Sequence, residues 1–330
     1  MDVDAFVAAH LREWQRLEQL VRRRWLSGAE ADEMVALYQR AATHLSVVRT
    51  RLPDPVLVGW LSSLVARGRN AVVGAPSGSW RSVARFWTET FPVAVYRARW
   101  WCLGTAGAFL VVAFGLILHL ARHPELYSRL GSSDAVRQLV EQDFADYYST
   151  YPAHSFAAQV WTNNALVAAG ALVFGITLVG GAYVLLGNAV SVGKIGGLMI
   201  GTGHAGVFFG LISPHGILEL TAVFVAAGTG LKVGWSWLDP GPLPRVQALA
   251  EAGRVAITVA IGLVAVLAVS GVLEAFVTPS GWPTWVRVGI GVTAEAAFLT
   301  YVGVLGRRAV RAGGTGDLAP DLAGYTAPVA

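Results

Sequence analysis

Residues 102–120 read CLGTAGAFLVVAFGLILHL and hold no aspartate, glutamate, lysine or arginine. An α-helix needs about 20 apolar residues to cross a hydrocarbon core that is about 30 Å thick. The stretch therefore predicts a transmembrane helix. The composition of all 330 residues agrees, since 54% are hydrophobic and only 14% are charged. Soluble domains carry about 25% charged residues, so an ordinary soluble enzyme is excluded.

Five further apolar stretches are long enough to form transmembrane helices. Together they predict an all-α fold, a polytopic membrane protein with about six transmembrane helices. Only Ser213-Pro214-His215 separates the third span from the fourth, which predicts a tight helical hairpin at that tripeptide. The five stretches are residues 164–186, 195–212, 216–235, 255–277 and 285–305.

Basic residues flank the spans unevenly, and cytoplasmic loops are the ones that carry an excess of arginine and lysine. Residues 1–101 hold 14 arginines, whereas residues 121–163 hold three arginines and five acidic residues. The basic residues that flank the later spans fall mostly on the side of the N-terminus. We therefore expect a multi-pass protein of the cell membrane, with both termini cytoplasmic and an external loop at residues 121–163.

The region before the first span, residues 1–101, is predicted to be a cytoplasmic helical domain. Ser27 with Glu30 three residues later has the pattern of a capping box, which predicts a second helix that runs to about Arg51. The segment Trp80–Trp101 interleaves arginines with aromatic residues. This pattern is typical of an interfacial helix on anionic lipid. We expect no nucleic-acid partner there, because the aromatic face has a nearer apolar partner in lipid.

The remaining chain divides into two further regions. Residues 102–306 form the predicted six-helix transmembrane domain. Residues 307–330 are rich in glycine, alanine and proline, and we predict a disordered cytoplasmic tail. The third span is the weakest because it is rich in glycine. Two interpretations stay open for it: a tightly packed helix, or a broken, re-entrant segment that lines a cavity.

Ionisable residues inside the predicted spans deserve attention because they usually face the bundle interior and often mark function. His215 and Glu219 are four residues apart on one helical face, in the first turns of the fourth span. Glu274 lies about one turn from the corresponding end of the fifth span. The predicted topology places all three at a similar depth in the outer leaflet, as an intramembrane polar cluster. His204 and Glu295 are accessory candidates nearer the middle of their spans.

Two interpretations of this cluster stay open. It is either a polar site for a substrate, a proton or a metal, or a clamp of interhelical hydrogen bonds. One histidine and two carboxylates match zinc ligand types, but the HxxxE spacing is weak and no HExxH motif is present. We therefore assign no catalytic residue and no metal ligand. We expect no cofactor, because the chain has no phosphate-binding loop or dinucleotide fingerprint.

Several blocks of the chain resemble the stage II sporulation protein M family. The most specific are Pro214-His215-Gly216 followed by Glu219-Leu220, and Leu273-Glu274-Ala275-Phe276-Val277-Thr278-Pro279. Asn163-Asn164, which opens the second span, and Gly187-Asn188, which closes it, fit the same pattern, so Asn163 and Asn188 join the accessory candidates. The resemblance implies a bacterial integral membrane protein that acts as a scaffold in a cell-envelope complex rather than as a hydrolase.

Three functions follow as hypotheses. The first is a non-enzymatic scaffold whose partners are other membrane or envelope proteins. The alternative is a transporter or permease-like subunit that uses the polar cluster. An intramembrane metal-dependent enzyme is the third and the weakest hypothesis. The glycine-rich helix faces also permit a homodimer.

Overall fold

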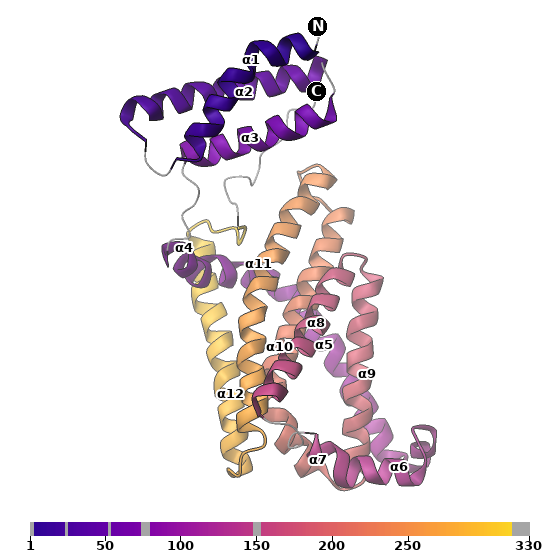
Figure 1. The fold of residues 1–330 in the computed structure, drawn as a ribbon. Coiled ribbons are helices and arrows are strands. Elements are labelled where there is room, and N and C mark those ends of the chain that lie inside the picture. The colour runs from indigo at the N-terminus through magenta and orange to yellow at the C-terminus, as the bar shows by residue number, and fades with distance from the viewer. Residues whose placement is uncertain (1–2, 24–25, 52–53, 74–79, 148–152, 319–330) are drawn as a thin grey trace. The chain divides into compact units, whose positions relative to one another are not determined.

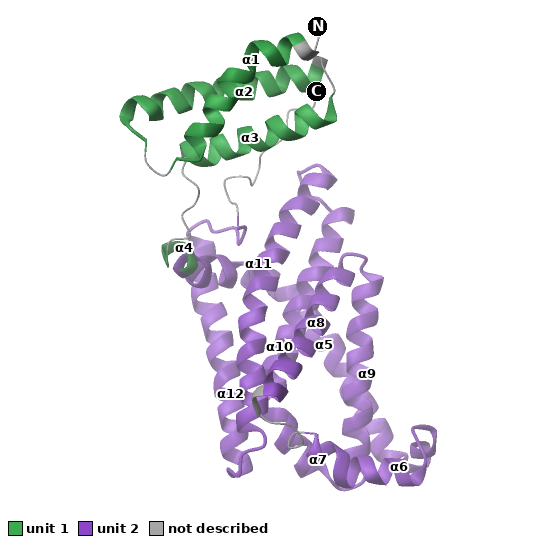
Figure 2. Ribbon diagram, in the orientation of Figure 1, with its two compact units in different colours: residues 1–83 green, residues 84–330 purple. Residues whose placement is uncertain are grey.

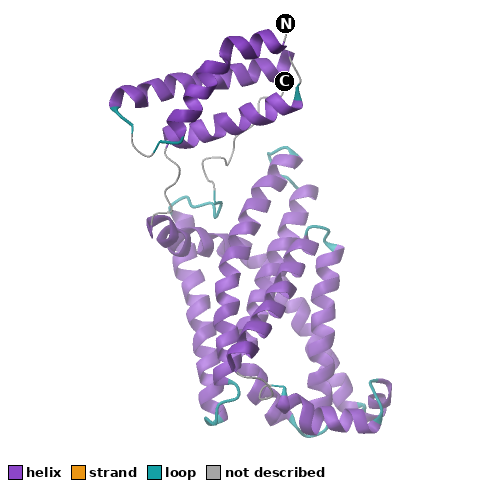
Figure 3. Cartoon of the chain, viewed as in Figure 1, coloured by secondary structure: helices purple, strands orange, loops and turns teal. Residues whose placement is uncertain are grey.

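The computed structural model describes residues 3–23, 26–51, 54–73, 80–147 and 153–318, and these contain helices but no strand (Figure 3). The all-α polytopic fold predicted from the sequence is confirmed. The chain divides into two compact units, residues 1–83 (unit 1) and residues 84–330 (unit 2), shown in Figure 2. The division falls after Val83, whereas the sequence analysis placed the domain boundary at residue 101.

Unit 1 contains three helices, α1 (Val3–Val21), α2 (Gly28–Arg51) and α3 (Pro55–Val73) (Figure 1). The predicted capping box opens α2, since the Ser27 backbone N–H donates to Glu30 Oε2 at 2.9 Å and the Glu30 N–H donates to Ser27 Oγ at 3.3 Å. The three helices close one hydrophobic core among themselves. Its fully buried members include Trp14, Leu17, Leu20, Val48, Leu61 and Leu64.

Unit 2 is a helical bundle that the short helix α4 (Trp80–Arg85) leads into. Its helices follow in the order η1 (Phe86–Thr90), α5 (Phe91–Arg122), η2 (Pro124–Arg129), α6 (Ser133–Gln138), η3 (Leu139–Asp143), α7 (Phe144–Asp146), α8 (Ala153–Gly175), α9 (Val179–Gly201), α10 (Ala205–Leu238), α11 (Arg245–Val272), η4 (Leu273–Val277), α12 (Thr284–Tyr301), η5 (Val302–Gly306) and α13 (Arg307–Arg311). The helix α10 lies at the centre and packs against α5, α8, α9, α11 and α12.

Five of the long helical segments in the described part of the chain are long and apolar enough to cross a membrane. The sixth long helix, α8, packs in the same bundle against α9, α10 and α11, but it is not one of the five. Its first half carries the polar residues Gln159, Asn163 and Asn164. The five membrane-crossing segments are residues 80–122, 179–201, 205–238, 245–277 and 284–311.

The helix boundaries differ from the predicted ones between residues 164 and 235. The predicted second span is interrupted, since α8 ends at Gly175 and α9 begins at Val179. The predicted hairpin at residues 213–215 is wrong, because Pro214 lies inside α10. The chain instead turns before α10, where Gly203 has a φ of +86° that glycine adopts without steric cost. Neighbouring helices make proline tolerable within a membrane helix, and here the backbone of Gly291 on α12 lies directly against Pro214.

The glycines of the predicted third span are explained by packing. The helix α9 is uninterrupted to Gly201, and four of its glycines lie against α5. A Cβ atom at Gly193 would lie 2.9 Å from Leu116, and one at Gly197 would lie 2.7 Å from Leu120. Small residues of this kind allow membrane helices to approach closely. The predicted span 195–212 is not one helix, however, because the chain turns at residues 202–204 between α9 and α10; the tightly packed helix describes only its first part, up to Gly201.

The sequence predicted one interfacial helix over Trp80–Trp101, but part of this segment lies inside the bundle. Residues 91–95 and Ala98 at the start of α5 are buried in the bundle. The Phe91 ring occupies the space beside Gly262 of α11, where a Cβ atom would lie 2.1 Å from the ring. The exposed aromatic residues of the segment include Trp80 and Trp100. Tertiary packing within the bundle therefore buries part of the predicted amphipathic stretch.

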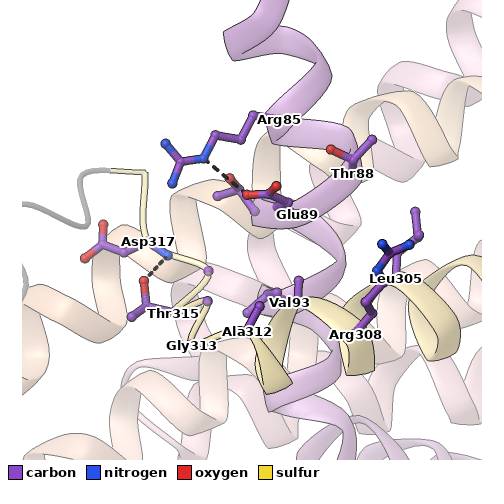
Figure 4. Close-up of a pocket in the computed structure, with 14 residues that line it drawn as sticks. Arg85, Thr88, Glu89, Val93, Leu305, Arg308, Ala312, Gly313, Thr315 and Asp317 are labelled. Atoms are coloured by element: carbon purple, nitrogen blue, oxygen red, sulfur yellow. Dashed lines mark hydrogen bonds and ion pairs between the residues drawn. The ribbon is translucent and has the colours of Figure 1, made fainter.

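Part of the predicted disordered tail is also packed. Beyond α13, residues 312–318 (the C-terminal strap) lie against α5 and α11, while residues 319–330 lie outside the described residues. Arg97 Nε donates to Gly314 O at 3.1 Å, and Thr258 Oγ1 donates to Gly316 O at 2.9 Å. Asp317 is buried and pairs with Arg254 at 2.8 Å. Figure 4 shows the strap at the edge of a cavity of about 510 Å³ that Arg85, Glu89 and Arg308 also line.

Replacing Asp317 with alanine is expected to loosen the strap without unfolding the bundle. The substitution leaves the partly exposed Arg254 without its carboxylate, at a cost of about 1.5 kcal/mol, or roughly tenfold in the opening equilibrium of the strap. Trypsin cleavage after the exposed Arg311, followed by mass spectrometry, should therefore accelerate about tenfold. Asp239→Ala, which changes an exposed loop residue, is the control. Equal cleavage rates in both variants would contradict this role of Asp317.

Candidate functional site

The structure brings His215, Glu219 and Glu274 together. His215 and Glu219 share one face of α10, and Glu274 lies in the π-helix η4 that ends the α11 segment. One ligand atom from each residue lies within 4.8 Å of the other two. The sequence analysis placed His215 and Glu219 in the first turns of their span. They instead lie about three and four turns inside α10, because α10 begins at Ala205.

The imidazole ring of His215 is held by a chain of hydrogen bonds. Its Nδ1 lies 3.1 Å from Thr278 Oγ1, and this hydroxyl donates to the carbonyl of Leu273 at 3.3 Å. A hydroxyl has one proton to give, so the network assigns the Nδ1 proton to His215 and the lone pair to Nε2. Nε2 lies 3.9 Å from Glu274 Oε2. Ser270 Oγ also donates to the His215 carbonyl at 3.1 Å.

The cluster is buried, and it lies close to Tyr147. The side chains of His215 and Glu274 are 7% and 5% exposed, and Glu219 is half-buried. Burial raises the pKa of Tyr147, and the neighbouring carboxylates of Glu274 and Glu219 raise it further. The exposed Tyr147 directly follows α7, so the cluster lies near the end of α7.

The four accessory candidates have hydrogen bonds outside the cluster. Glu295 Oε1 accepts from Thr221 Oγ1 at 2.8 Å and joins α12 to α10. Asn188 Nδ2 donates to the carbonyl of Val184 within α9 at 2.9 Å. His204 Nδ1 lies 3.3 Å from Thr202 Oγ1 in the turn before α10, and Asn163 Nδ2 donates to Asn164 Oδ1 at 3.4 Å. The cluster therefore consists of the three residues that the sequence selected first.

Unit 1 contains a second group of the same kind, which the sequence did not single out. His10, Glu13 and His44 place their ligand atoms within 4.8 Å of one another. Burial lowers the pKa of His44, and the charge of His10 adds to that effect. The i, i+3 spacing of His10 and Glu13 on α1 was a signal that could have found two members. His44 lies on α2, so its part in the group depends on tertiary packing.

Comparison with known proteins identifies the family. A family model described as Stage II sporulation protein M matches residues 100–279, which is more than half of the chain. A second model, described as a domain of unknown function (DUF8413), matches residues 4–74. No curated protein and no solved structure matches the chain. The first match contains all three cluster residues, and the second match lies within unit 1.

Proposed function

This chain belongs to the stage II sporulation protein M family, and we propose that it acts as a non-enzymatic scaffold in a membrane complex. It is an integral membrane protein with five helical segments long and apolar enough to span the bilayer. In the proposed arrangement, unit 2 anchors the protein in the cell membrane and unit 1 binds a partner protein in the cytoplasm.

The observation that carries this proposal is the self-contained core of unit 1. Trp14, Leu17 and Leu61 are buried among the helices α1, α2 and α3 alone. The unit also has its own family model, separate from the one that matches the membrane bundle. A domain with its own core is able to fold independently. An added helical domain of this kind suits the recruitment of a partner to the membrane.

The polar contacts inside unit 2 support a structural role for the bundle. Thr105 Oγ1 on α5 donates to the carbonyl of Phe224 on α10 at 3.1 Å. The Thr221–Glu295 and Ser270–His215 hydrogen bonds join α10 to α12 and to α11. Interhelical hydrogen bonds of this kind stabilise membrane bundles by about 1 kcal/mol each. The central helix is thereby tied to three neighbours, as a rigid anchor requires.

The orientation of the bundle is part of the proposal. The arginine excess in residues 1–101 supports a cytoplasmic N-terminus, and the contact of Gly314 with Arg97 near the start of α5 supports a C-terminal strap on the same side. The exposed Trp80 and Trp100 support contact with the membrane surface. The Arg99 guanidinium lies 4.3 Å from the ring centroid of Tyr96, so it stands among aromatic residues where an anionic headgroup would pair with it.

A photo-cross-linking experiment in the native host tests the scaffold. A photoreactive amino acid at Val56, which is 80% exposed in unit 1, should yield one dominant cross-linked protein. The same amino acid at the exposed Val304 of the bundle serves as the control and should not yield that product. Deleting residues 1–79 should also abolish co-purification of the partner. The proposal would be refuted if Val56 gave no cross-linked product, or gave only a cross-link to a second copy of this chain.

A further inference from the structure

We propose that His215, Glu219 and Glu274 bind one divalent first-row transition-metal ion, with Zn²⁺ as the probe. The ion would lie inside the bundle and would bridge α10 to the π-helix η4. The scaffold proposal does not require this site. The ligand set is one imidazole and two carboxylates from helices that adjoin in the bundle. Imidazole favours zinc and its neighbours over Mg²⁺ and Ca²⁺, which prefer all-oxygen sites.

The distances suit a metal that draws the ligands together slightly. Zinc lies about 2.0–2.2 Å from nitrogen and oxygen ligands, so two ligands of a tetrahedral site are about 3.3 Å apart. The separation between His215 Nε2 and Glu274 Oε2 is 3.9 Å. A closure of about 0.6 Å would complete this edge of the tetrahedron. Changes of side-chain rotamer supply a movement of this size without moving the helices.

The histidine is already oriented for metal binding. A metal-ligating histidine donates its other ring N–H to a neighbouring oxygen, which fixes the tautomer and the ring orientation. The Nδ1 of His215 makes that hydrogen bond to Thr278, as described above. In this tautomer Nε2, which lies 3.9 Å from Glu274 Oε2, is the ring nitrogen that would bind the metal. Thr278 is fully buried, and its carbonyl accepts from Arg287 Nη1 at 2.5 Å.

A second, independent observation points to a cation. Glu274 Oε2 is buried and has no hydrogen-bond donor among the described residues, and the side chain is only 5% exposed. A buried polar atom without a partner is costly and requires an explanation. Neither Glu219 nor Glu274 forms an ion pair with an arginine or lysine in the described ranges. A divalent ion supplies two positive charges for these two carboxylates.

In the other group with suitable ligand atoms, in unit 1, His44 and Glu13 each have another polar partner. Trp14 Nε1 donates to His44 Nδ1 at 3.1 Å, and Arg40 pairs with Glu13 at 3.1 Å. The neutral His44 ring therefore carries its proton on Nε2. The metal site is accordingly assigned to the bundle. Measurements are best made in a His10→Gln background, which removes one ligand of the unit 1 group.

The test uses the full chain, purified in detergent and stripped with EDTA. Zn²⁺ binding is measured by calorimetry and by metal analysis after dialysis, and the absorption spectrum of bound Co²⁺ reports the coordination geometry. We expect one Zn²⁺ per chain, retained in excess Mg²⁺. Glu274→Gln should weaken Zn²⁺ binding by more than about 100-fold, and Thr278→Val, which removes the orienting hydrogen bond, by about 10–100-fold. Glu295→Gln, which changes another membrane carboxylate, should leave the affinity within about twofold.

Three outcomes would overturn the proposal. The first is that the well-folded starting protein, which carries neither Glu274→Gln nor Thr278→Val, binds no Zn²⁺ or Co²⁺. The second is an equal loss of affinity in Glu274→Gln and Glu295→Gln, which would indicate general damage to the bundle. The third is a Co²⁺ spectrum that Glu274→Gln leaves unchanged. Glu219→Gln provides a second ligand variant if Glu274→Gln does not fold, which its size-exclusion profile would reveal.

Discussion

Replacing Trp14 with alanine is expected to unfold unit 1 while the membrane bundle keeps its fold. The Trp14 side chain is 1% exposed and lies at the centre of the three-helix core. Its Nε1 also donates to His44, and its ring packs against Trp60. Truncating a buried tryptophan costs about 3–5 kcal/mol. A domain of this size has only about 5 kcal/mol of stability, so almost all of it is lost.

The measurement compares thermal melts of the excised residues 1–73, followed by circular dichroism. The starting fragment should melt cooperatively, and the Trp14→Ala fragment should show no transition above 25 °C. Val56→Ala is the control, because Val56 is 80% exposed and its loss should change the stability by less than about 0.5 kcal/mol. A cooperative transition in Trp14→Ala close to that of the control would show that the core does not depend on this residue.

The second large effect is expected at Gly230, where α8 and α10 touch through their backbones. A Cβ atom on Gly230 would lie 2.4 Å from the carbonyl oxygen of Leu172 and 3.0 Å from that of Ala171. Backbone oxygens cannot rotate away as the end of a side chain can. Gly230→Ala must therefore push the two helices apart, at a cost of about 3 kcal/mol. The bundle should melt at a clearly lower temperature and elute as aggregate on size exclusion.

Gly187→Ala provides the matched control for this prediction. Gly187 lies within the membrane helix α9, and a Cβ atom there would meet nothing within 4 Å. Alanine gains up to about 1 kcal/mol over glycine inside a helix, so this variant should be as stable as the starting protein or slightly more stable. Tryptophan fluorescence during a thermal ramp in detergent compares the two variants. If Gly230→Ala melts at the same temperature as Gly187→Ala, the close approach of α8 and α10 is not important for stability.

The family could be recognised from the sequence because its most specific blocks are local. Pro214-His215-Gly216 with Glu219-Leu220, and the block around Glu274, each lie within a few residues, and both fall inside the matched range of residues 100–279. The helical spacing of His215 and Glu219 also placed them correctly on one face. Their position along the helix was misjudged, because that depended on where α10 begins.

The apolar stretches and the capping box were sufficient to predict an all-helical membrane protein, since span length and helix capping depend on neighbouring residues alone. The passage of α10 through Pro214 and the packed strap at Asp317 were not predictable in this way. Each depends on a contact between residues far apart in the sequence, such as Pro214 with Gly291 or Asp317 with Arg254. The sequence placed Glu274 at a similar depth to His215, but the contact between the two side chains belongs to the same class. Only the packing of α11 against α10 brings these two side chains within 3.9 Å, because hydropathy describes each helix and not its partner.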